Sequence, residues 1–207
     1  MRLVFFGPPG AGKGTQAALI CENFGLVHIS TGDMIREQIA LGSDIGKLAA
    51  SVIEKGNLVP DEVVIEMVKM RIAKEDAEKG FILDGFPRTL PQAYKLSKLT
   101  DIEMVISIDV PLDVLVGRIT SRRICPACKA TYISDGSSSQ TCSKCGSLLT
   151  TRKDDTEAVA MERFRIYNEE TCPILDYYEN TSKVVHIDGT QAVDKVCSDI
   201  KRAILEL

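Results

Sequence analysis

Three features are absent from this sequence of 207 residues. It has no excess of positive charge, because the formal net charge at pH 7 is -4, and this argues against a broad electrostatic grip on nucleic acid. It has no apolar stretch near the roughly 20 residues that a helix needs to cross a bilayer. Its apolar start, residues 1–7, is too short for a secretory signal. We therefore expect a cytoplasmic protein that binds neither nucleic acid nor membranes and holds any anionic ligand with local arginines.

Short apolar runs alternate with longer segments of helical periodicity. Runs typical of strands occupy residues 3–6, 26–29, 81–83, 104–109 and 184–187. Helical spacing of apolar residues covers 62–76, 112–122 and 155–178. Because strands that alternate with helices form a parallel sheet covered on both faces, we predict a three-layer α/β/α fold with a five-stranded parallel sheet.

Two segments depart from this alternation. Residues 31–59 are helical and punctuated by glycine, and residues 124–151 are rich in Cys, Ser, Thr and Gly. Both are typical of insertions that rise from the ends of core elements. We predict a core formed by residues 1–29, 60–121 and 153–207, a helical insertion at 30–59 and a lid at 122–152.

A glycine-rich segment follows the first predicted strand and opens the first helix. It reads Gly7-Pro8-Pro9-Gly10-Ala11-Gly12-Lys13-Gly14-Thr15. In that context, backbone N–H groups from Gly10 to Thr15 can converge on phosphate oxygens at the positive end of a helix dipole. Lys13 adds a mobile positive charge for the β- and γ-phosphates of a nucleotide. The segment therefore predicts a phosphate-binding loop rather than a plain turn.

The residue after the lysine departs from the usual form of such loops. That form places Ser or Thr directly after the lysine, whereas here Gly14 intervenes and the hydroxyl follows at Thr15. We therefore expect Thr15 to contact phosphate rather than to ligate Mg²⁺ directly.

Four of the seven cysteines form two close pairs, Cys125-Pro126-Ala127-Cys128 and Cys142-Ser143-Lys144-Cys145, separated by 13 residues. Two such pairs can place four thiolates tetrahedrally around one structural Zn²⁺. A short insertion builds little core, so the metal would supply the missing stability. Two disulfides, free thiols, or iron in place of zinc are the alternatives. The scattered Cys21, Cys172 and Cys197 are predicted to be small buried hydrophobes.

Five further motifs occur along the chain. They are Ser30-Thr31-Gly32-Asp33-Met34-Ile35-Arg36, Gly56-Asn57-Leu58-Val59-Pro60-Asp61, Asp84-Gly85-Phe86-Pro87-Arg88 with Gln92, Arg118 with Arg122 and Arg123, and Thr151-Arg152-Lys153-Asp154-Asp155 with Arg163. Together with the loop and the cysteines, their order and spacing resemble the nucleoside monophosphate kinases, and in particular the adenylate kinases with a zinc-containing lid. The resemblance covers essentially the whole chain.

The resemblance implies an activity: reversible transfer of the γ-phosphoryl group of Mg·ATP to AMP, which gives two ADP. It implies that residues 30–59 bind AMP and that Asp84 holds Mg²⁺ through water. Catalysis would consist of aligning the phosphoryl group and neutralising its charge, with no protein nucleophile. The residues that would do so are Lys13, Arg88, Arg122, Arg152 and Arg163.

The resemblance also implies one site for each nucleotide. ATP would be bound by Gly10, Ala11, Gly12, Lys13, Gly14, Thr15, Arg118, Arg122, Thr131, Tyr132 and Gln191. AMP would be bound by Thr31, Arg36, Asn57, Leu58, Val59, Gly85, Phe86, Pro87, Arg88, Gln92, Arg152 and Arg163. The amide of Gln92 offers the donor and the acceptor that match the paired edge of adenine.

Some of these residues have a structural interpretation as well. Ser30, followed three residues later by Asp33, is typical of a helix N-cap. Arg118 and Arg122 lie four apart on one predicted helix and would share a face. Residues 151–155 are predicted to form a hinge.

Two other functions stay open. One is a kinase of another monophosphate, such as UMP or CMP, although Thr31, Gln92 and the cysteine lid favour AMP. The other is a non-enzymatic zinc-ribbon adaptor for nucleic acid or protein, which has no use for the phosphate loop, the 84–88 motif and the arginines together. Because two hinged covers need free surface around them, we expect a monomer.

Overall fold

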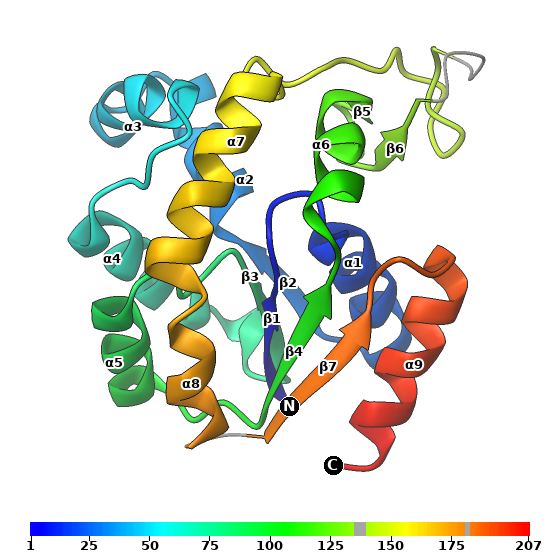
Figure 1. Cartoon of the computed structure of the whole chain (residues 1–207). Helices are drawn as coiled ribbons and strands as arrows, with labels where there is room; N and C mark the ends of the chain where they lie inside the picture. The colour runs from blue at the N-terminus through cyan, green and yellow to red at the C-terminus, as the bar shows by residue number, and fades with distance from the viewer. Residues whose placement is uncertain (135–139, 181–182) are drawn as a thin grey trace.

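The computed structural model describes residues 1–134, 140–180 and 183–207, and a five-stranded parallel sheet forms its centre (Figure 1). The strands are β1 (Arg2–Phe6), β2 (Val27–Ser30), β3 (Phe81–Asp84), β4 (Met104–Asp109) and β7 (Lys183–Asp188). They lie in the order β2-β3-β1-β4-β7, and every pairing is parallel. The predicted sheet is confirmed.

Helices cover both faces of this sheet. One face carries α1 (Lys13–Phe24) and α9 (Val193–Leu205), and the other carries α4 (Asp61–Ile72), α5 (Leu90–Leu99) and α8 (Ile174–Glu179). Two more helices, α6 (Leu112–Thr120) and α7 (Glu157–Ile166), contribute buried side chains to the same apolar cluster as α1 and α9. Within the described ranges, none of the helices combines the length and the apolar composition that crossing a membrane requires.

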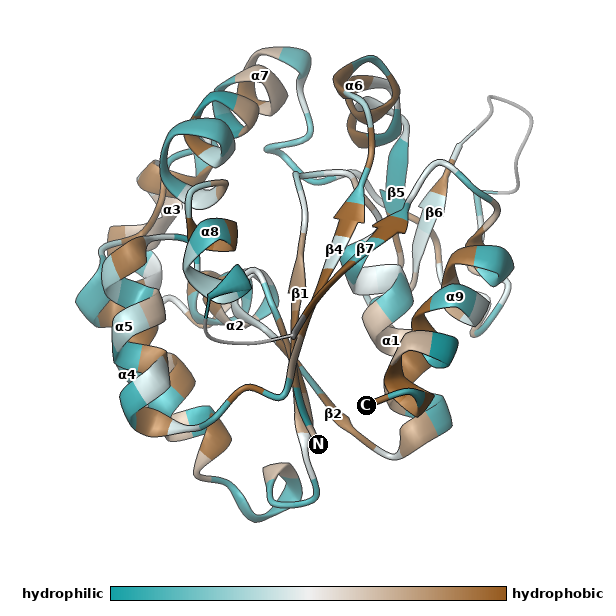
Figure 2. Ribbon diagram, turned by 60° about the horizontal axis from the view of Figure 1, so that its bottom comes forward, coloured by the Kyte–Doolittle hydropathy of each residue, from teal (hydrophilic) through white to brown (hydrophobic). Residues whose placement is uncertain are grey.

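The side chains of the central strand β1 alternate between two cores. Leu3 and Phe5 pack with α1 and α9, whereas Val4 and Phe6 pack with the helices of the opposite face. All four side chains are at most 3% exposed. A strand covered on both faces must be largely apolar, and much of β4 and β7 is accordingly brown in Figure 2.

The helical insertion forms two helices, α2 (Thr31–Ala40) and α3 (Asp44–Glu54). The Ser30 hydroxyl caps α2 by accepting a hydrogen bond from Asp33 N at 3.3 Å, so the predicted N-cap is confirmed. A Cβ at Gly46 would lie 2.1 Å from the carbonyl oxygen of Gln38, so a larger residue would force α3 away from α2. The insertion is therefore a compact arm that starts where β2 ends.

The cysteine-rich segment forms a small antiparallel sheet of β5 (Arg122–Ile124) and β6 (Thr131–Ile133). Isolated bridges join Ile124 to Thr150 and Thr141 to Leu148. Part of the predicted lid, residues 135–139, lies outside the described residues. The boundaries that we predict for the core, the insertion and the lid stay predictions.

One predicted helix ends before an arginine of the site. The segment 112–122 ends as a helix at Thr120, because Arg122 already pairs with Ile133 in the lid sheet. Arg118 and Arg122 therefore do not share a helix face, and that prediction is wrong. The lid sheet thus begins at Arg122, inside the segment for which helical periodicity predicts a helix.

Two other predicted helices are shorter as well. The segment 62–76 leaves the α-helix at Ile72 and continues as a 3₁₀ turn, Glu75–Ala77. The segment 155–178 is divided by a π-helical stretch, Tyr167–Thr171, and a turn at Pro173, whose missing N–H interrupts the helical ladder. Cys172 is exposed at this turn, so its predicted burial is wrong; Cys197 is buried and Cys21 partly buried.

Candidate active site

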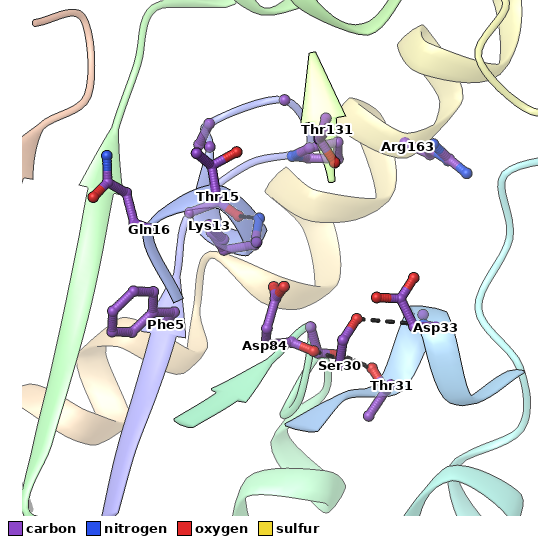
Figure 3. A pocket seen from close by; sticks show the side chains of 18 of the residues that line it. Phe5, Lys13, Thr15, Gln16, Ser30, Thr31, Asp33, Asp84, Thr131 and Arg163 are labelled. Carbon is purple, nitrogen blue, oxygen red and sulfur yellow. Dashed lines mark hydrogen bonds between the residues drawn. The ribbon is translucent and has the colours of Figure 1, made fainter. Parts of the chain in front are cut away.

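A cavity of about 820 Å³ opens where β1, β2 and β3 end, between the insertion and the lid. Figure 3 shows Lys13 and Thr15 at the start of α1, Asp84 at the end of β3, and Thr31 and Asp33 on α2. Every residue predicted to bind a nucleotide or Mg²⁺ lines this one cavity. These residues are Gly10, Ala11, Gly12, Lys13, Gly14, Thr15, Thr31, Arg36, Asn57, Leu58, Val59, Asp84, Gly85, Phe86, Pro87, Arg88, Gln92, Arg118, Arg122, Thr131, Tyr132, Arg152, Arg163 and Gln191.

The glycine-rich loop ends in the first turn of α1. Gly12 is the N-cap with φ of 97°, a left-handed conformation that favours glycine. Helix geometry leaves the N–H groups of Lys13, Gly14 and Thr15 without intrahelical acceptors, so they are free to bind an anion. The ammonium of Lys13 folds back over the loop and donates to the carbonyl oxygens of Gly7 at 2.6 Å and Pro8 at 2.9 Å.

The charge of Lys13 is poorly stabilised in this position. Burial lowers the pKa of Lys13 to about 8, against the favourable charge of Asp84, and Arg88 and Arg122 lower it further. A bound anion would reverse this balance. A phosphate bound next to Lys13 would therefore stabilise the charged form of this lysine.

Asp84 faces the loop from the end of β3 (Figure 3). Its Oδ2 lies 3.2 Å from Nε2 of His28, and a Cβ at Gly14 would lie 3.4 Å from the same oxygen. Burial alone would raise the pKa of Asp84, but the contact with His28 and the charge of Lys13 hold it below its usual range. The carboxylate is therefore ionised at neutral pH and lies next to the loop.

Two arginines between the lid and α7 are held by buried carboxylates. Arg122, on β5, forms a two-pronged ion pair with Asp155, with Nε at 2.8 Å from Oδ2. Arg163, on α7, pairs with Asp154 and lies 3.7 Å from Asp155. The side chain of Asp155 is only 1% exposed. The bidentate geometry fixes the Arg122 guanidinium at the cavity wall.

Two further arginines meet at Asp33 of the insertion. Arg36 Nη2 lies 2.8 Å, and Arg152 Nη2 lies 3.7 Å, from Asp33 Oδ1. Arg152 precedes α7, so it reaches the cavity from the predicted hinge rather than from the helix of Arg163. One carboxylate thus joins the insertion to the segment that follows the lid.

The arginines nevertheless outnumber their acidic partners. Burial, with repulsion from Arg122, Arg88, Arg36 and Arg152, lowers the pKa of Arg163 to about 9. Burial, with repulsion from Arg36 and Arg122, lowers the pKa of Arg152 to about 10. Both stay protonated at neutral pH, so the cavity holds positive charge at an energetic cost that a polyanion would relieve.

A second group of contacts surrounds the 84–88 turn. Thr31 Oγ1 and Arg88 Nε both donate to the carbonyl oxygen of Gly85 at 2.8 Å. Gly85 has φ of 76°, and a Cβ there would lie 2.7 Å from Arg88 Nη2. Gln92 is 2% exposed; its Oε1 accepts from Arg88 N and its Nε2 donates to Asp61 Oδ1, both at 2.7 Å. These contacts fix the wall nearest the insertion.

The opposite end of the cavity is closed by the turn after β7. Arg118, on α6, donates to the carbonyl oxygen of Gly189 at 3.0 Å. The Gln191 side chain donates to the carbonyl oxygen of Asp188 at 3.0 Å and to Asp199 at 3.2 Å. Because these bonds occupy its side-chain amide, Gln191 is suited to contact a ligand through its backbone.

The four lid cysteines form one cluster. All four sulfur atoms lie within 4.8 Å of one another, with Cys125–Cys145 at 3.4 Å and Cys128–Cys142 at 3.5 Å. A tetrahedral site with Zn–S bonds of about 2.3 Å places sulfurs about 3.8 Å apart. A hydrogen bond with the Tyr132 hydroxyl, 3.2 Å away, lowers the pKa of Cys142 to about 6 and favours its thiolate. The cluster can therefore hold a metal ion.

Four acidic or basic partners in this site were not predicted from the sequence as site residues. Asp154 and Asp155 belong to the sequence Arg-Lys-Asp-Asp. Adjacent residues of opposite charge between a lid and a helix are typical of an ion-pair network, so this pattern could have identified them. His28 and Asp61 gave no such signal. Each contacts a residue about 30 or more positions away, at Asp84 and Gln92, and sequence spacing does not reveal such pairs.

Known proteins resemble this chain over its full length. The family profile described as adenylate kinase matches residues 5–183. The chain is 47% identical to the adenylate kinase of Archaeoglobus fulgidus, over 100% of this chain and 98% of the relative. It is 46% identical to the adenylate kinases of Caldanaerobacter subterraneus subsp. tengcongensis, over 99% and 96% of the two chains, and of Bacillus licheniformis, over 99% and 98%. The chain therefore belongs to the adenylate kinase family.

Proposed function

We propose that this enzyme transfers the γ-phosphoryl group of ATP to AMP, reversibly, and so produces two ADP. Family membership makes it a phosphotransferase that binds these nucleotides. One observation carries the proposal for this site. The phosphate loop, an ionised aspartate and an excess of arginines line a single cavity large enough for two nucleotides at about 820 Å³.

The polyphosphate of ATP would lie on the loop. The free N–H groups of Lys13, Gly14 and Thr15 supply donors at the positive end of α1. Lys13 would exchange its bonds to the carbonyls of Gly7 and Pro8 for bonds to phosphate oxygens. The adenine and ribose would lie between Arg118, the backbone at Gln191, and the lid residues Thr131 and Tyr132.

The AMP site would lie on the side of the insertion. Arg36 and Arg88 can bind the phosphate dianion in a two-pronged manner. Thr31, Gln92 and the extended segment 57–59 would surround the base, with the turn at 85–87 as the floor. All of these line the cavity, which supports the assignment.

Catalysis in this arrangement requires alignment and charge neutralisation. The acceptor is an oxygen of the AMP phosphate, which is already ionised, so no general base is needed. Arg122, Arg152 and Arg163 would neutralise the charge that spreads over the oxygens of the transferred group. Exclusion of water by the insertion and the lid would prevent transfer to the wrong acceptor.

Asp84 fits a role as the residue that holds Mg²⁺. Its carboxylate is ionised and lies beside the loop, where a Cβ at Gly14 would be 3.4 Å from Oδ2. Mg²⁺ retains most of its waters and binds proteins through few carboxylates, so contact through water suits this single acid. Held there by Asp84, the ion would neutralise part of the charge of the ATP phosphates.

The cysteine cluster fits one structural Zn²⁺. Four thiols within 4.8 Å of one another complete a tetrahedron and leave no open position for chemistry. The hydrogen bond with the Tyr132 hydroxyl lowers the pKa of Cys142 and so favours its thiolate. The segment carries few other buried apolar residues than Cys125 and Cys142, so the metal would replace a core.

The insertion at 30–59 and the lid at 122–152 would act as two separate covers on the core. The Asp33–Arg152 contact is long, at 3.7 Å, and its Asp33 side chain is 46% exposed, so a moving arm can break it at little cost. We also propose a cytoplasmic monomer that has no nucleic acid partner, since the acidic net charge of -4 gives no broad attraction to phosphate backbones.

The substrate assignment predicts a clear preference among nucleotides. With ATP as donor and AMP, CMP, UMP or GMP as acceptor, we expect the largest kcat/KM for AMP, with ADP as the product. A coupled assay measures each rate. Equal rates with CMP or UMP would assign another monophosphate kinase, and no turnover of any of the four would support a non-enzymatic adaptor.

The lowered pKa of Lys13 predicts proton uptake when ATP binds at alkaline pH. At pH 9, free Lys13 is mostly neutral because its pKa is about 8. Phosphate contacts raise the pKa of Lys13 in the complex, so Lys13 should take up close to one proton on binding at pH 9 and almost none at pH 7, in addition to the uptake at pH 9 by Arg163, whose pKa is about 9. Calorimetry in buffers of different ionisation enthalpy counts the protons.

Lys13→Arg is the matched control for this measurement, because arginine stays charged throughout the range. At pH 9 the Lys13→Arg variant should bind ATP while taking up about one proton fewer than the wild type. Equal uptake in both proteins would show that another group titrates.

The zinc assignment predicts about one equivalent of Zn²⁺ in freshly purified protein. Cys128→Ser should release the metal and lower the midpoint of thermal unfolding, because the lid loses its cross-link. Cys172→Ser is the matched control, since Cys172 is exposed and lies outside the cluster. Elemental analysis with less than half an equivalent of zinc, or with iron in its place, would overturn the assignment.

The two proposed covers predict a more compact molecule with ligand. The radius of gyration from small-angle X-ray scattering should fall when a dinucleotide polyphosphate that mimics ATP and AMP together is added, and ATP alone should give a smaller change. An unchanged radius in saturating ligand would contradict hinged covers.

A further inference from the structure

We infer that Asp61 is a positioning residue that fixes the orientation of the Gln92 amide, and that it thereby selects adenine over 6-oxopurines in the monophosphate pocket. The inference rests on the proposed function, since it concerns the base of AMP. It follows from three hydrogen bonds that join α4, α5 and the 84–88 turn.

Asp61 is the first residue of α4, and its carboxylate contacts the start of α5 with both oxygens. Oδ1 accepts from Gln92 Nε2 at 2.7 Å, and Oδ2 accepts from Thr89 Oγ1 at 2.8 Å. Thr89 is the N-cap of α5 and accepts from Gln92 N at 3.3 Å. The three side chains form one closed set of bonds in the partly buried wall of the site.

The amide of Gln92 is held from both sides. Its oxygen accepts from Arg88 N at 2.7 Å, while its nitrogen donates to Asp61. Rotation of the amide by half a turn would place its NH₂ group against the N–H of Arg88 and its oxygen against the carboxylate. Both contacts would then be repulsive, so the two neighbours together define which end is the donor.

Gln92 lines the cavity, and its amide keeps unused hydrogen-bonding capacity. An amide nitrogen has two hydrogens and an amide oxygen has two lone pairs, and the bonds to Asp61 and Arg88 use one of each. One donor and one acceptor are left, side by side and in a fixed order. This is the pattern that a single edge of a purine can meet.

The fixed order of donor and acceptor on Gln92 distinguishes purines by the hydrogen-bonding groups at N1 and C6. Adenine presents an acceptor at N1 and a donor at its 6-amino group, which match the remaining N–H and lone pair of Gln92. Hypoxanthine and guanine present the reverse, a donor at N1 and an acceptor at the 6-oxo group. A freely rotating glutamine could match either pattern, whereas a fixed one matches adenine. Unpaired polar groups in such a buried wall make mismatches costly.

The alternative is a purely structural role, in which Asp61 only joins α4 to α5 and its carboxylate interacts favourably with two helix N-termini. That role would change stability without changing the choice between bases. The ratio of kcat/KM for AMP to that for IMP separates the two roles, because IMP differs from AMP only at this edge. The split between KM and kcat provides a second distinction.

Three substitutions form the test. Asp61→Ala removes the acceptor for Gln92; Asp61→Asn keeps one oxygen for Gln92 Nε2 and serves as the conservative rescue. Glu62→Ala is the matched control, because Glu62 is an exposed acid in the same first turn of α4. For each protein, kcat and KM are measured with AMP and with IMP at saturating ATP, together with the thermal midpoint.

For Asp61→Ala we expect KM for AMP to rise about tenfold and the AMP-to-IMP ratio to fall about tenfold, with kcat changed less than about twofold, as for one lost hydrogen bond to a charged group. Asp61→Asn should recover most of the ratio, and Glu62→Ala should match the wild type. An unchanged ratio in Asp61→Ala, or an equal fall in Glu62→Ala, would overturn the inference.

The wild-type protein gives an independent test that does not depend on the folding of a variant. In NMR spectra of the free protein, the two side-chain amide protons of Gln92 should be resolved and exchange slowly with water. Rapid exchange, as for a free glutamine, would overturn the inference. Failure of wild-type protein to phosphorylate AMP would instead overturn the proposed function, so the two failures are distinct.

Discussion

The concentration of positive charge in one cavity is the constraint on which the rest of the structure depends. Arg36, Arg88, Arg122, Arg152 and Arg163 line the same space as Lys13. Their repulsion, added to burial, lowers the pKa of Lys13 to about 8 and of Arg163 to about 9. Such an arrangement is costly without an anion and favourable with one, so relief of this repulsion contributes to the free energy of anion binding.

The fold holds these charges in place with a small set of acids. Asp154 and Asp155 lie almost fully buried between the lid and α7, and Asp33 lies between the insertion and the hinge. Each acid restrains an arginine without filling the cavity. The parallel sheet supplies the geometry, because β1, β2 and β3 end together beneath the loop and α2 begins where β2 ends. The zinc proposed at the cysteine cluster would give the lid a fixed shape that a short segment with little core could not provide.

Much of this architecture could be predicted because the chemistry is local. The loop around Lys13 and the paired cysteines are recognisable from adjacent residues alone, and the central strands are recognisable as apolar runs because both faces of the sheet are covered. The end of α6 could not be predicted, since Arg122 leaves the helix to pair with Ile133 of the lid sheet. The roles of His28 and Asp61 were hidden for a similar reason. Their partners, Asp84 and Gln92, come from distant segments that only the fold brings together.

The most direct test of the central claim is a crystal structure with a bisubstrate dinucleotide polyphosphate bound. We predict that the phosphate chain lies on the N–H groups of Lys13, Gly14 and Thr15 and that the guanidinium groups of Arg88, Arg122, Arg152 and Arg163 surround it. A structure in which this loop is empty and the ligand lies elsewhere would contradict the account.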